Sequence, residues 1–140
     1  MTKNKTLITI AILTMGLIGM APGAVTPAIA DISKGFPDIP PTTIMMLATL
    51  PSLLMVPANL FSGAVTGKKI KFRTMVIFAL ILFTVSGTLP FFSTNFTFLL
   101  VMRALFGISV GLIMPLGPAF IFSFFEGPAA ANIMGLSGVF

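Results

Sequence analysis

The segment from Phe98 to Phe122 constrains the fold of this chain more than any other segment. Its sequence, FLLVMRALFGISVGLIMPLGPAFIF, is almost uninterrupted apolar and small residues with one permanent charge, Arg103. At 1.5 Å per residue such a run is long enough to cross a hydrocarbon core about 30 Å thick. An Arg in hydrocarbon costs about 2.5–3.5 kcal/mol on insertion scales, so it normally faces protein, a carboxylate or water. Arg103 is therefore a candidate functional residue.

The whole chain has the composition of an integral membrane protein. Of its 140 residues, 56% are hydrophobic and 8% are charged, whereas soluble domains contain about 25% charged residues. The absence of Cys and His excludes thiolate and imidazole metal sites and Ser-His or Cys-His catalysis. The three carboxylates, Asp31, Asp38 and Glu126, fall near helix ends or in loops. We therefore expect an all-α transmembrane protein that is not an enzyme and uses no cofactor or metal.

Hydrophobic runs predict four membrane-spanning helices and the start of a fifth. The spans are expected at about residues 7–30, 44–66, 74–92 and 98–122, with the fifth beginning at about 132. The Pro-rich segment 31–43 between the first two spans is expected to be an external loop. The alternative for the first span is a signal peptide cleaved after Ala30, but its apolar run exceeds the about 7–15 residues of a signal-peptide core.

The positions of the cations predict the orientation in the membrane. Lys68, Lys69, Lys71 and Arg73 lie together in the short loop between the second and third spans, and Lys3 and Lys5 precede the first span. Cytoplasmic loops carry an excess of Lys and Arg. We therefore expect a multi-pass protein of the plasma membrane with its N-terminus and this loop in the cytoplasm. The same argument assigns the net charge of +5 to topology, so no nucleic acid is expected as a partner.

Small residues predict where helices approach each other closely. Glycines recur at spacings of three or four, which place them on one helix face: Gly16, Gly19 and Gly23 in the first span, and Gly107 and Gly111 in the fourth. Helix packing is the favoured interpretation, and a role in lining a substrate path is the alternative.

Four features together resemble the N-terminal part of a major facilitator superfamily transporter of the drug–proton antiporter type. The first is the spacing of the spans. The second is the basic loop, where Gly63, Lys68 and Lys71 match the family motif and Arg73 follows it. This loop departs from the motif at three positions, because Gly67 replaces an Asp, Ile70 a Gly and Phe72 a basic residue.

The other two features lie in the fourth span and after it. Arg103, Gly107 and Gly111 are similar to the Arg-x-x-x-Gly motif of the fourth helix in drug–proton antiporters, and residues 124–126 and 135–138 are similar to the segment that leads into the fifth helix. The resemblance implies that the chain forms part of a six-helix half of a twelve-helix transporter, which works by rocking two halves about a central site.

The resemblance also implies which residues meet the substrate. The first and fourth helices line the central cavity of this fold, and their Met and Phe side chains suit varied lipophilic compounds. The candidates are Met15, Met20, Phe106 and Met114, and the alternative is that these residues face lipid or only pack. For Arg103 we expect a role in coupling or gating, with a structural role as the alternative. Asp31, at the outer end of the first helix, is the nearby carboxylate in the sequence, and we hypothesise that the two pair or share water when the outer gate closes.

We therefore expect secondary active efflux of a small lipophilic compound coupled to protons, across a lipid bilayer. Four spans and the start of a fifth cannot form two opposed halves, so the remainder of a transporter chain is expected as a partner, and the 140 residues alone are not expected to transport. One alternative is an oligomeric transporter like the small multidrug resistance proteins, but these need a Glu in the first helix, which is absent here. The other alternative is a small membrane interaction protein without transport activity.

Overall fold

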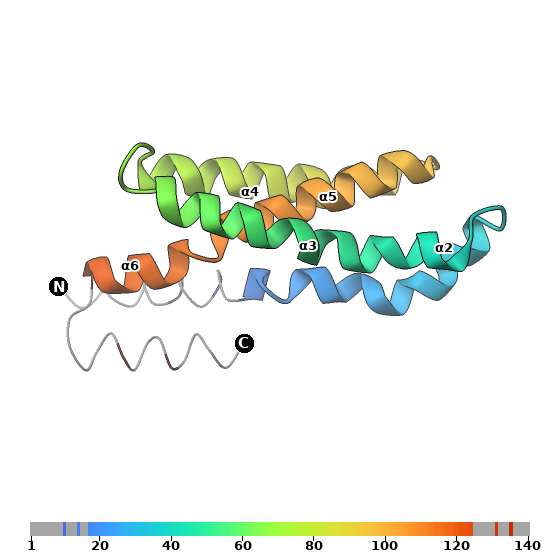
Figure 1. Cartoon of the computed structure of the whole chain (residues 1–140), viewed down its shortest axis with the longest axis horizontal. Coiled ribbons are helices and arrows are strands. Elements are labelled where there is room, and N and C mark those ends of the chain that lie inside the picture. The colour runs from blue at the N-terminus through green and yellow to red at the C-terminus, as the bar shows by residue number, and fades with distance from the viewer. Residues whose placement is uncertain (1–9, 11–13, 15–16, 125–130, 132–134, 136–140) are drawn as a thin grey trace.

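The computed structural model describes residues 10, 14, 17–124, 131 and 135. Within them the regular elements are helical, with one isolated bridge between Thr66 and Ile70. In chain order they are the 3-10 helix η1 (Ala21–Ala28), α2 (Ile29–Gly35), α3 (Pro41–Val65), α4 (Phe72–Thr88), the 3-10 helix η2 (Leu89–Phe92), α5 (Phe96–Ile113) and α6 (Leu116–Phe124). Figure 1 shows the long helices α3, α4 and α5 lying beside one another.

Three helical stretches in the described residues are long and apolar enough to cross a membrane. They are Pro41–Val65, Phe72–Phe92 and Phe96–Ile121, and they correspond to the predicted second, third and fourth spans. The predicted first span, 7–30, is described only in part. Of the predicted fifth, which begins at about 132, Gly135 is described and is helical, and the rest lies outside the described residues.

The described part of the first span differs from the single α-helix that was predicted. A turn at Gly19 and Met20 leads into η1, which contains Pro22 and Pro27. A proline has no N–H to donate to the carbonyl four residues earlier, so two prolines in one segment disfavour regular α-helix. The helix then continues as α2 to Gly35, which corrects the prediction that residues 31–43 are all loop.

Tertiary packing explains why α2 extends beyond the hydrophobic run. Ile29, Ile32 and Phe36 pack against a buried cluster of Ile44, Leu47 and Phe96. The Phe36 and Phe96 rings meet edge to face, with centroids 5.5 Å apart. The apolar contact continues beyond the end of α2 at Gly35, through Phe36 and Ile39 of the Pro-rich turn.

Local capping shifts the ends of the predicted spans by two or three residues. α3 begins at Pro41 rather than 44, because the amides of Thr43 and Ile44 donate to the carbonyl of Pro40 and Pro suits the first turn of a helix. α5 begins at Phe96 rather than 98, because the side chain of Asn95 caps it. α4 begins at Phe72 rather than 74.

The predicted fourth span, 98–122, is broken into two helices. α5 ends at Ile113 and α6 begins at Leu116, with Met114 and Pro115 between them. Pro115 cannot donate to the carbonyl of Gly111, so the α-helical ladder is interrupted there. The apolar stretch continues through the break to Ile121.

α5 is the central helix of the described bundle. It packs extensively against both α3 and α4, whereas α3 and α4 contact each other much less. In the membrane-spanning windows, 44% of the α5 stretch is buried, compared with 22% for α3 and 17% for α4. A second buried cluster, at the end opposite α2, joins Ala58 of α3, Met75 and Ala79 of α4, and Leu112 and Ile113 of α5.

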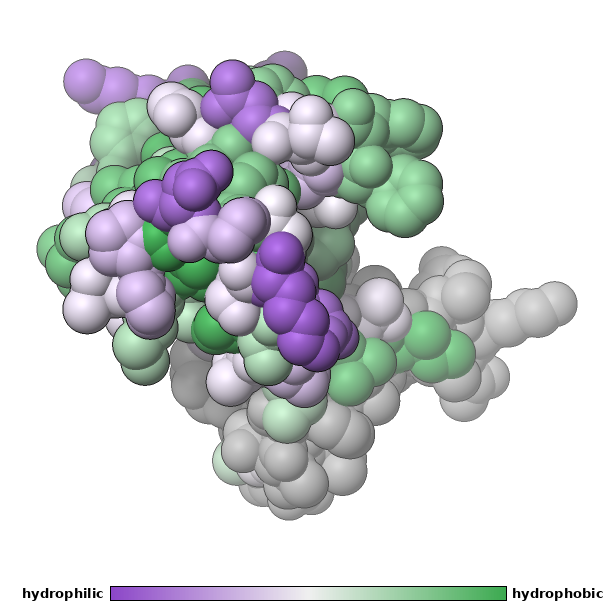
Figure 2. Space-filling model, turned by 90° about the vertical axis from the view of Figure 1, so that its right-hand side faces the viewer, coloured by the Kyte–Doolittle hydropathy of each residue, from purple (hydrophilic) through white to green (hydrophobic). Residues whose placement is uncertain are grey.

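The polar residues are separated from the apolar sides. Figure 2 faces the end that carries α2 and shows hydrophilic residues gathered there, with hydrophobic residues around and behind them. Many large apolar side chains on α3 and α4 are exposed, among them Leu53, Leu60 and Phe78. An apolar exterior of this kind is what a bilayer requires.

Candidate functional site: the surroundings of Arg103

The backbone contact between α3 and α5 positions the candidate site. Gly107 faces Pro51 of α3, and a Cβ atom built on Gly107 would overlap the carbonyl oxygen of Pro51. A Cβ on Gly111 would overlap the carbonyl oxygen of Met55 and lie 2.8 Å from the Cβ of Ala58. The two glycines therefore allow an approach that no larger residue would permit.

A buried hydrogen bond joins the same two helices. The Ser62 hydroxyl, which has no exposed surface, donates to the carbonyl of Leu112 across 2.7 Å. A hydroxyl in an apolar interior is costly unless it has such a partner. The contact fixes the register of α5 against α3, and with it the position of Arg103 on α5.

Arg103 lines a cavity of about 260 Å³ between three parts of the chain. The walls come from η1, from α4 with η2, and from α5: Ala21, Ala24, Val25, Ser86, Gly87, Pro90, Arg103 and Phe106. Arg103 is half-buried and is the one charged residue among these eight. The cavity therefore combines small and apolar walls with one fixed positive charge.

The guanidinium of Arg103 lies near an aromatic pair. Its Cζ is 5.5 Å from the centroid of the Phe106 ring, which is within cation–π range. Phe106 is buried and packs against Phe83 of α4 with centroids 4.8 Å apart. The ring also lies 3.6 Å from the position of a Cβ on Gly87, an ordinary van der Waals distance, so Gly87 of α4 is a close neighbour of Phe106.

Arg103 and Asp31 are not brought together in this structure. Of the η1 residues that line the cavity, Val25 is the one nearest to Asp31 in the sequence. Asp31 itself lies in the following helix, α2, and is not among the lining residues. The Asp31 carboxylate accepts a hydrogen bond from Lys34 at 2.8 Å, and both side chains are largely exposed. Neither described carboxylate, Asp31 or Asp38, forms a salt bridge with Arg103.

Of the other residues expected to line the cavity, Phe106 does line it, whereas the described residues Met20 and Met114 do not. Met20 is 59% exposed and Met114 is 39% exposed at the break between α5 and α6. Neither lines the cavity at Arg103. Met15 and Gly16 lie outside the described residues. Gly19 lies in the turn before η1, and a Cβ on Gly23 would meet no atom within 4 Å.

The basic loop forms a tight turn at the end of the bundle opposite α2. Three consecutive amides, of Lys68, Lys69 and Ile70, lie 3.0–3.3 Å from the carbonyl of Val65. Gly67 has a φ of 82°, a left-handed conformation that suits glycine. The family motif has an Asp at this position, so the glycine gives this loop a turn geometry that an Asp would strain.

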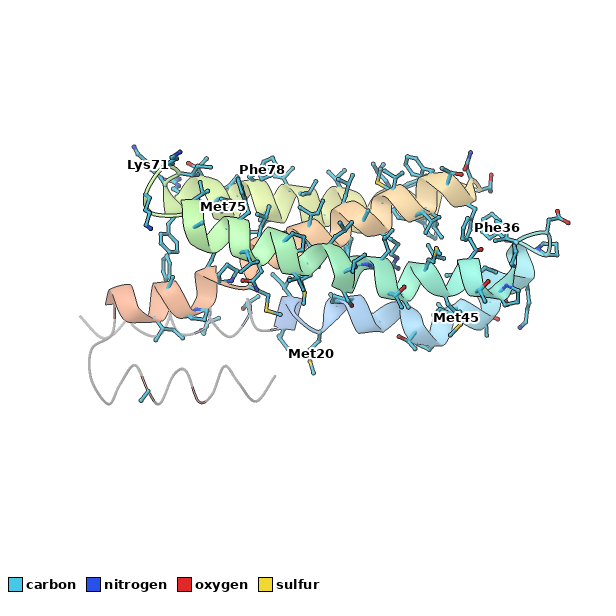
Figure 3. All side chains as sticks on the ribbon, viewed as in Figure 1. Met20, Phe36, Met45, Lys71, Met75 and Phe78 are labelled. Carbon is cyan, nitrogen blue, oxygen red and sulfur yellow. The ribbon has the colours of Figure 1, made fainter. Side chains whose placement is uncertain are left out.

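The residues of the motif-matching loop are exposed. Gly63 lies on α3 with open space at its Cβ position, Lys68 and Lys71 lie in the turn, and Arg73 lies in the first turn of α4. Figure 3 shows Lys71 at this end and Phe36 at the other. In the described part of the chain none of these cations forms a salt bridge.

Sequence reasoning did not single out the α4 residues of the site or Ser62 of α3. Phe83, Ser86 and Gly87 recur at spacings of three and one, which places them near one face of α4, and Pro90 follows three residues later in η2. The small residues Ser86 and Gly87 in a helix of bulky side chains are the signal that could have indicated a contact there. Ser62 could have been found in the same way, one turn after Ala58.

The chemistry of the site is that of binding rather than catalysis. Arg103 offers several N–H donors and no acceptor, and it stays charged. The described residues contain no group of three or more metal-ligating side chains. A cavity of this kind is suited to holding an anionic or polar group against apolar walls.

These features define a multi-pass helical membrane protein with a charged cavity between its helices. The sequence matches the family model of the Major Facilitator Superfamily over residues 7–140. The chain therefore belongs to the major facilitator superfamily, a family of membrane transporters. Comparisons with curated proteins and with solved structures give no significant match.

Proposed function

We propose that this chain forms part of a secondary active transporter that exports a small lipophilic compound in exchange for protons. The observation that carries the proposal is the half-buried charge of Arg103 in a cavity whose other walls are small or apolar. A charge within a membrane-spanning helix is costly and normally marks a functional path. The family match supports membrane transport by a major facilitator chain over a small multidrug-resistance-like protein or an interaction protein.

The apolar walls support the proposed substrate class. Val25, Pro90 and Phe106 offer apolar surface to a lipophilic compound, and Arg103 offers donors to a polar or anionic group at one end of it. Binding sites for small molecules commonly combine apolar walls with a few placed polar groups. The remainder of a major facilitator chain is proposed to supply the opposite wall.

The fixed charge supports proton coupling. Arg103 does not release its own proton, but a positive charge favours the ionised form of any carboxylate that approaches it. Asp31 is proposed as a coupling or gating partner in another conformation. Its exposed pair with Lys34 is of the kind worth about 0–1 kcal/mol, so it is easily exchanged for another partner.

The proposed location is the plasma membrane, with the N-terminus and the basic loop in the cytoplasm. The loop's cations support this orientation, because cytoplasmic loops are enriched in Lys and Arg.

The test is transport by the full-length protein in proteoliposomes with an acidic interior. The probes are three dyes of different charge, the anion 8-anilinonaphthalene-1-sulfonate, the zwitterion rhodamine B and the cation rhodamine 6G, and intravesicular pH is followed with pyranine. We expect at least one dye to accumulate when the gradient is present, with a matching loss of internal protons. Equal accumulation with and without the gradient would contradict proton coupling, and no accumulation of any dye would contradict the lipophilic substrate class.

A further inference from the structure

An apolar groove lies between α3 and α4, separate from the cavity at Arg103. Its lining comes from α3 (Leu54, Pro57, Ala58, Phe61), α4 (Phe78) and α5 (Ile108, Leu112), and every lining residue is apolar. Its volume is about 340 Å³, within the about 300–1,000 Å³ of small-molecule sites. It shares no lining residue with the cavity at Arg103.

The groove exists because α5 separates the two outer helices. α3 and α4 both pack on α5 but contact each other little, so α5 forms the floor between them. Ala58 of α3 and Leu112 of α5 are buried at the floor of the groove, where these two helices meet, whereas the rings of Phe61 and Phe78 are 56% and 57% exposed along the rims. The rims can therefore contact a further apolar molecule without rearrangement of the core.

The groove runs toward the basic loop. Phe61 lies one turn before the end of α3 at Val65, about 6 Å along the helix axis, and Phe78 lies about 9 Å beyond the start of α4 at Phe72. Lys71 and Phe78 are both labelled at this end of the molecule in Figure 3. A molecule whose apolar part lies in the groove would thus place a polar end among the loop cations.

The loop carries four exposed cations and no described acid to neutralise them. They are Lys68, Lys69, Lys71 and Arg73. The described carboxylates, Asp31 and Asp38, belong to α2 and the turn after it, at the opposite end of the bundle. Basic segments next to a membrane-spanning helix attract anionic lipid headgroups by about 1 kcal/mol per Lys or Arg.

We propose that the groove between α3 and α4, together with the basic loop, is a binding site for an anionic phospholipid of the adjacent leaflet. The acyl chain lies between Phe61 and Phe78 on the floor of Ala58 and Leu112. The phosphate lies at the loop, within reach of the Lys side chains. The site is distinct from the proposed transport path, so its test does not depend on transport.

The experiment measures phospholipid binding to the full-length protein by native mass spectrometry in detergent. The probes are phosphatidylglycerol and phosphatidylcholine with identical acyl chains, and glycerol phosphate as a headgroup without chains. We expect tighter binding of phosphatidylglycerol than of phosphatidylcholine and no retained glycerol phosphate.

Two variants and two matched controls locate the site. The double variant Lys68→Gln/Lys69→Gln is expected to weaken phosphatidylglycerol binding about tenfold or more, since two attractive charges are removed. Phe78→Ala is expected to weaken it too. The controls Lys34→Gln and Phe91→Ala change an exposed cation and an exposed ring outside the site, and they are expected to leave binding unchanged.

The outcomes are decisive in both directions. Weaker binding in both site variants, with unchanged binding in both controls, supports the site. Equal binding of the two phospholipids would overturn the proposal. It would also be overturned if Lys68→Gln/Lys69→Gln weakened the binding of phosphatidylglycerol and of glycerol phosphate alike while Phe78→Ala had no effect. Unchanged binding in both site variants would place the bound phosphatidylglycerol elsewhere on the protein, which would also overturn the proposal.

Discussion

At the scale of single residues, Arg103 and Gly107 lie one turn apart on α5 and need different surroundings. Arg103 needs a polar or aromatic surrounding, and it lies beside Phe106 at the cavity. Gly107 needs the absence of a side chain, because Pro51 of α3 lies against it. The closeness of α3 to α5 and the placing of the charge are thus properties of neighbouring residues on one helix.

The contact at Gly107 gives a stability prediction. In Gly107→Ala the new Cβ overlaps the backbone of Pro51, so α3 and α5 must separate, and we expect a loss of about 1–3 kcal/mol in the free energy of unfolding. The measurement is the unfolding midpoint of the full-length protein in a denaturing-detergent titration.

A matched glycine controls for the change in helix propensity. Gly63→Ala on α3 places its Cβ in open space, and we expect it to be neutral or stabilising by up to about 1 kcal/mol. If Gly107→Ala and Gly63→Ala gave the same midpoint, the close approach of α3 and α5 would be contradicted.

At the scale of elements, hydrophobic runs predict the existence of α3, α4 and α5, but their ends depend on local chemistry. Pro115 divides the predicted fourth span, and its effect follows from the missing N–H. α2 was not predicted because its apolar residues are few, and its stability comes from packing on Ile44 and Phe96, which no local pattern reveals.

The start of α5 gives a prediction for a helix cap. Oδ1 of Asn95 accepts from the amides of Thr97 and Phe98 at 2.9 and 3.3 Å. Asn95→Ala removes this acceptor, and we expect a loss of about 0.5–2 kcal/mol together with faster hydrogen exchange at these two amides. Asn95→Asp keeps an acceptor and is expected to retain the protection. Unchanged exchange in Asn95→Ala would show that the cap does not hold this end of α5.

The candidate site was predictable only where its contacts are local. Arg103 and Phe106 are three residues apart, and Asp31 and Lys34 have the same spacing, so these contacts follow from helix geometry. The walls from η1 and α4, and the bond from Ser62 to Leu112, join segments far apart in the sequence. Hydropathy along the sequence does not indicate which distant segments will enclose a cavity, or which backbone carbonyl a serine hydroxyl will reach.

At the scale of the whole molecule, α5 lines both a cavity and a groove, and these two sites share no lining residue. One is the charged cavity at Arg103, proposed for transport, and the other is the apolar groove toward the basic loop, proposed for lipid. Membership of the major facilitator superfamily rests on the match over residues 7–140. The central proposal is that the charge of Arg103 couples proton movement to export.

The most direct test of that proposal compares two assays on full-length Arg103→Ala in proteoliposomes, using whichever dye the wild-type protein transports. One assay measures accumulation driven by a pH gradient, and the other measures dye exchange without a gradient. We predict that gradient-driven accumulation falls at least about tenfold while exchange continues, and that Arg103→Lys, which keeps the charge, retains part of the accumulation. Unchanged gradient-driven accumulation in Arg103→Ala would contradict the coupling role, and an equal fall in both assays would assign Arg103 to substrate binding or to the structure rather than to coupling.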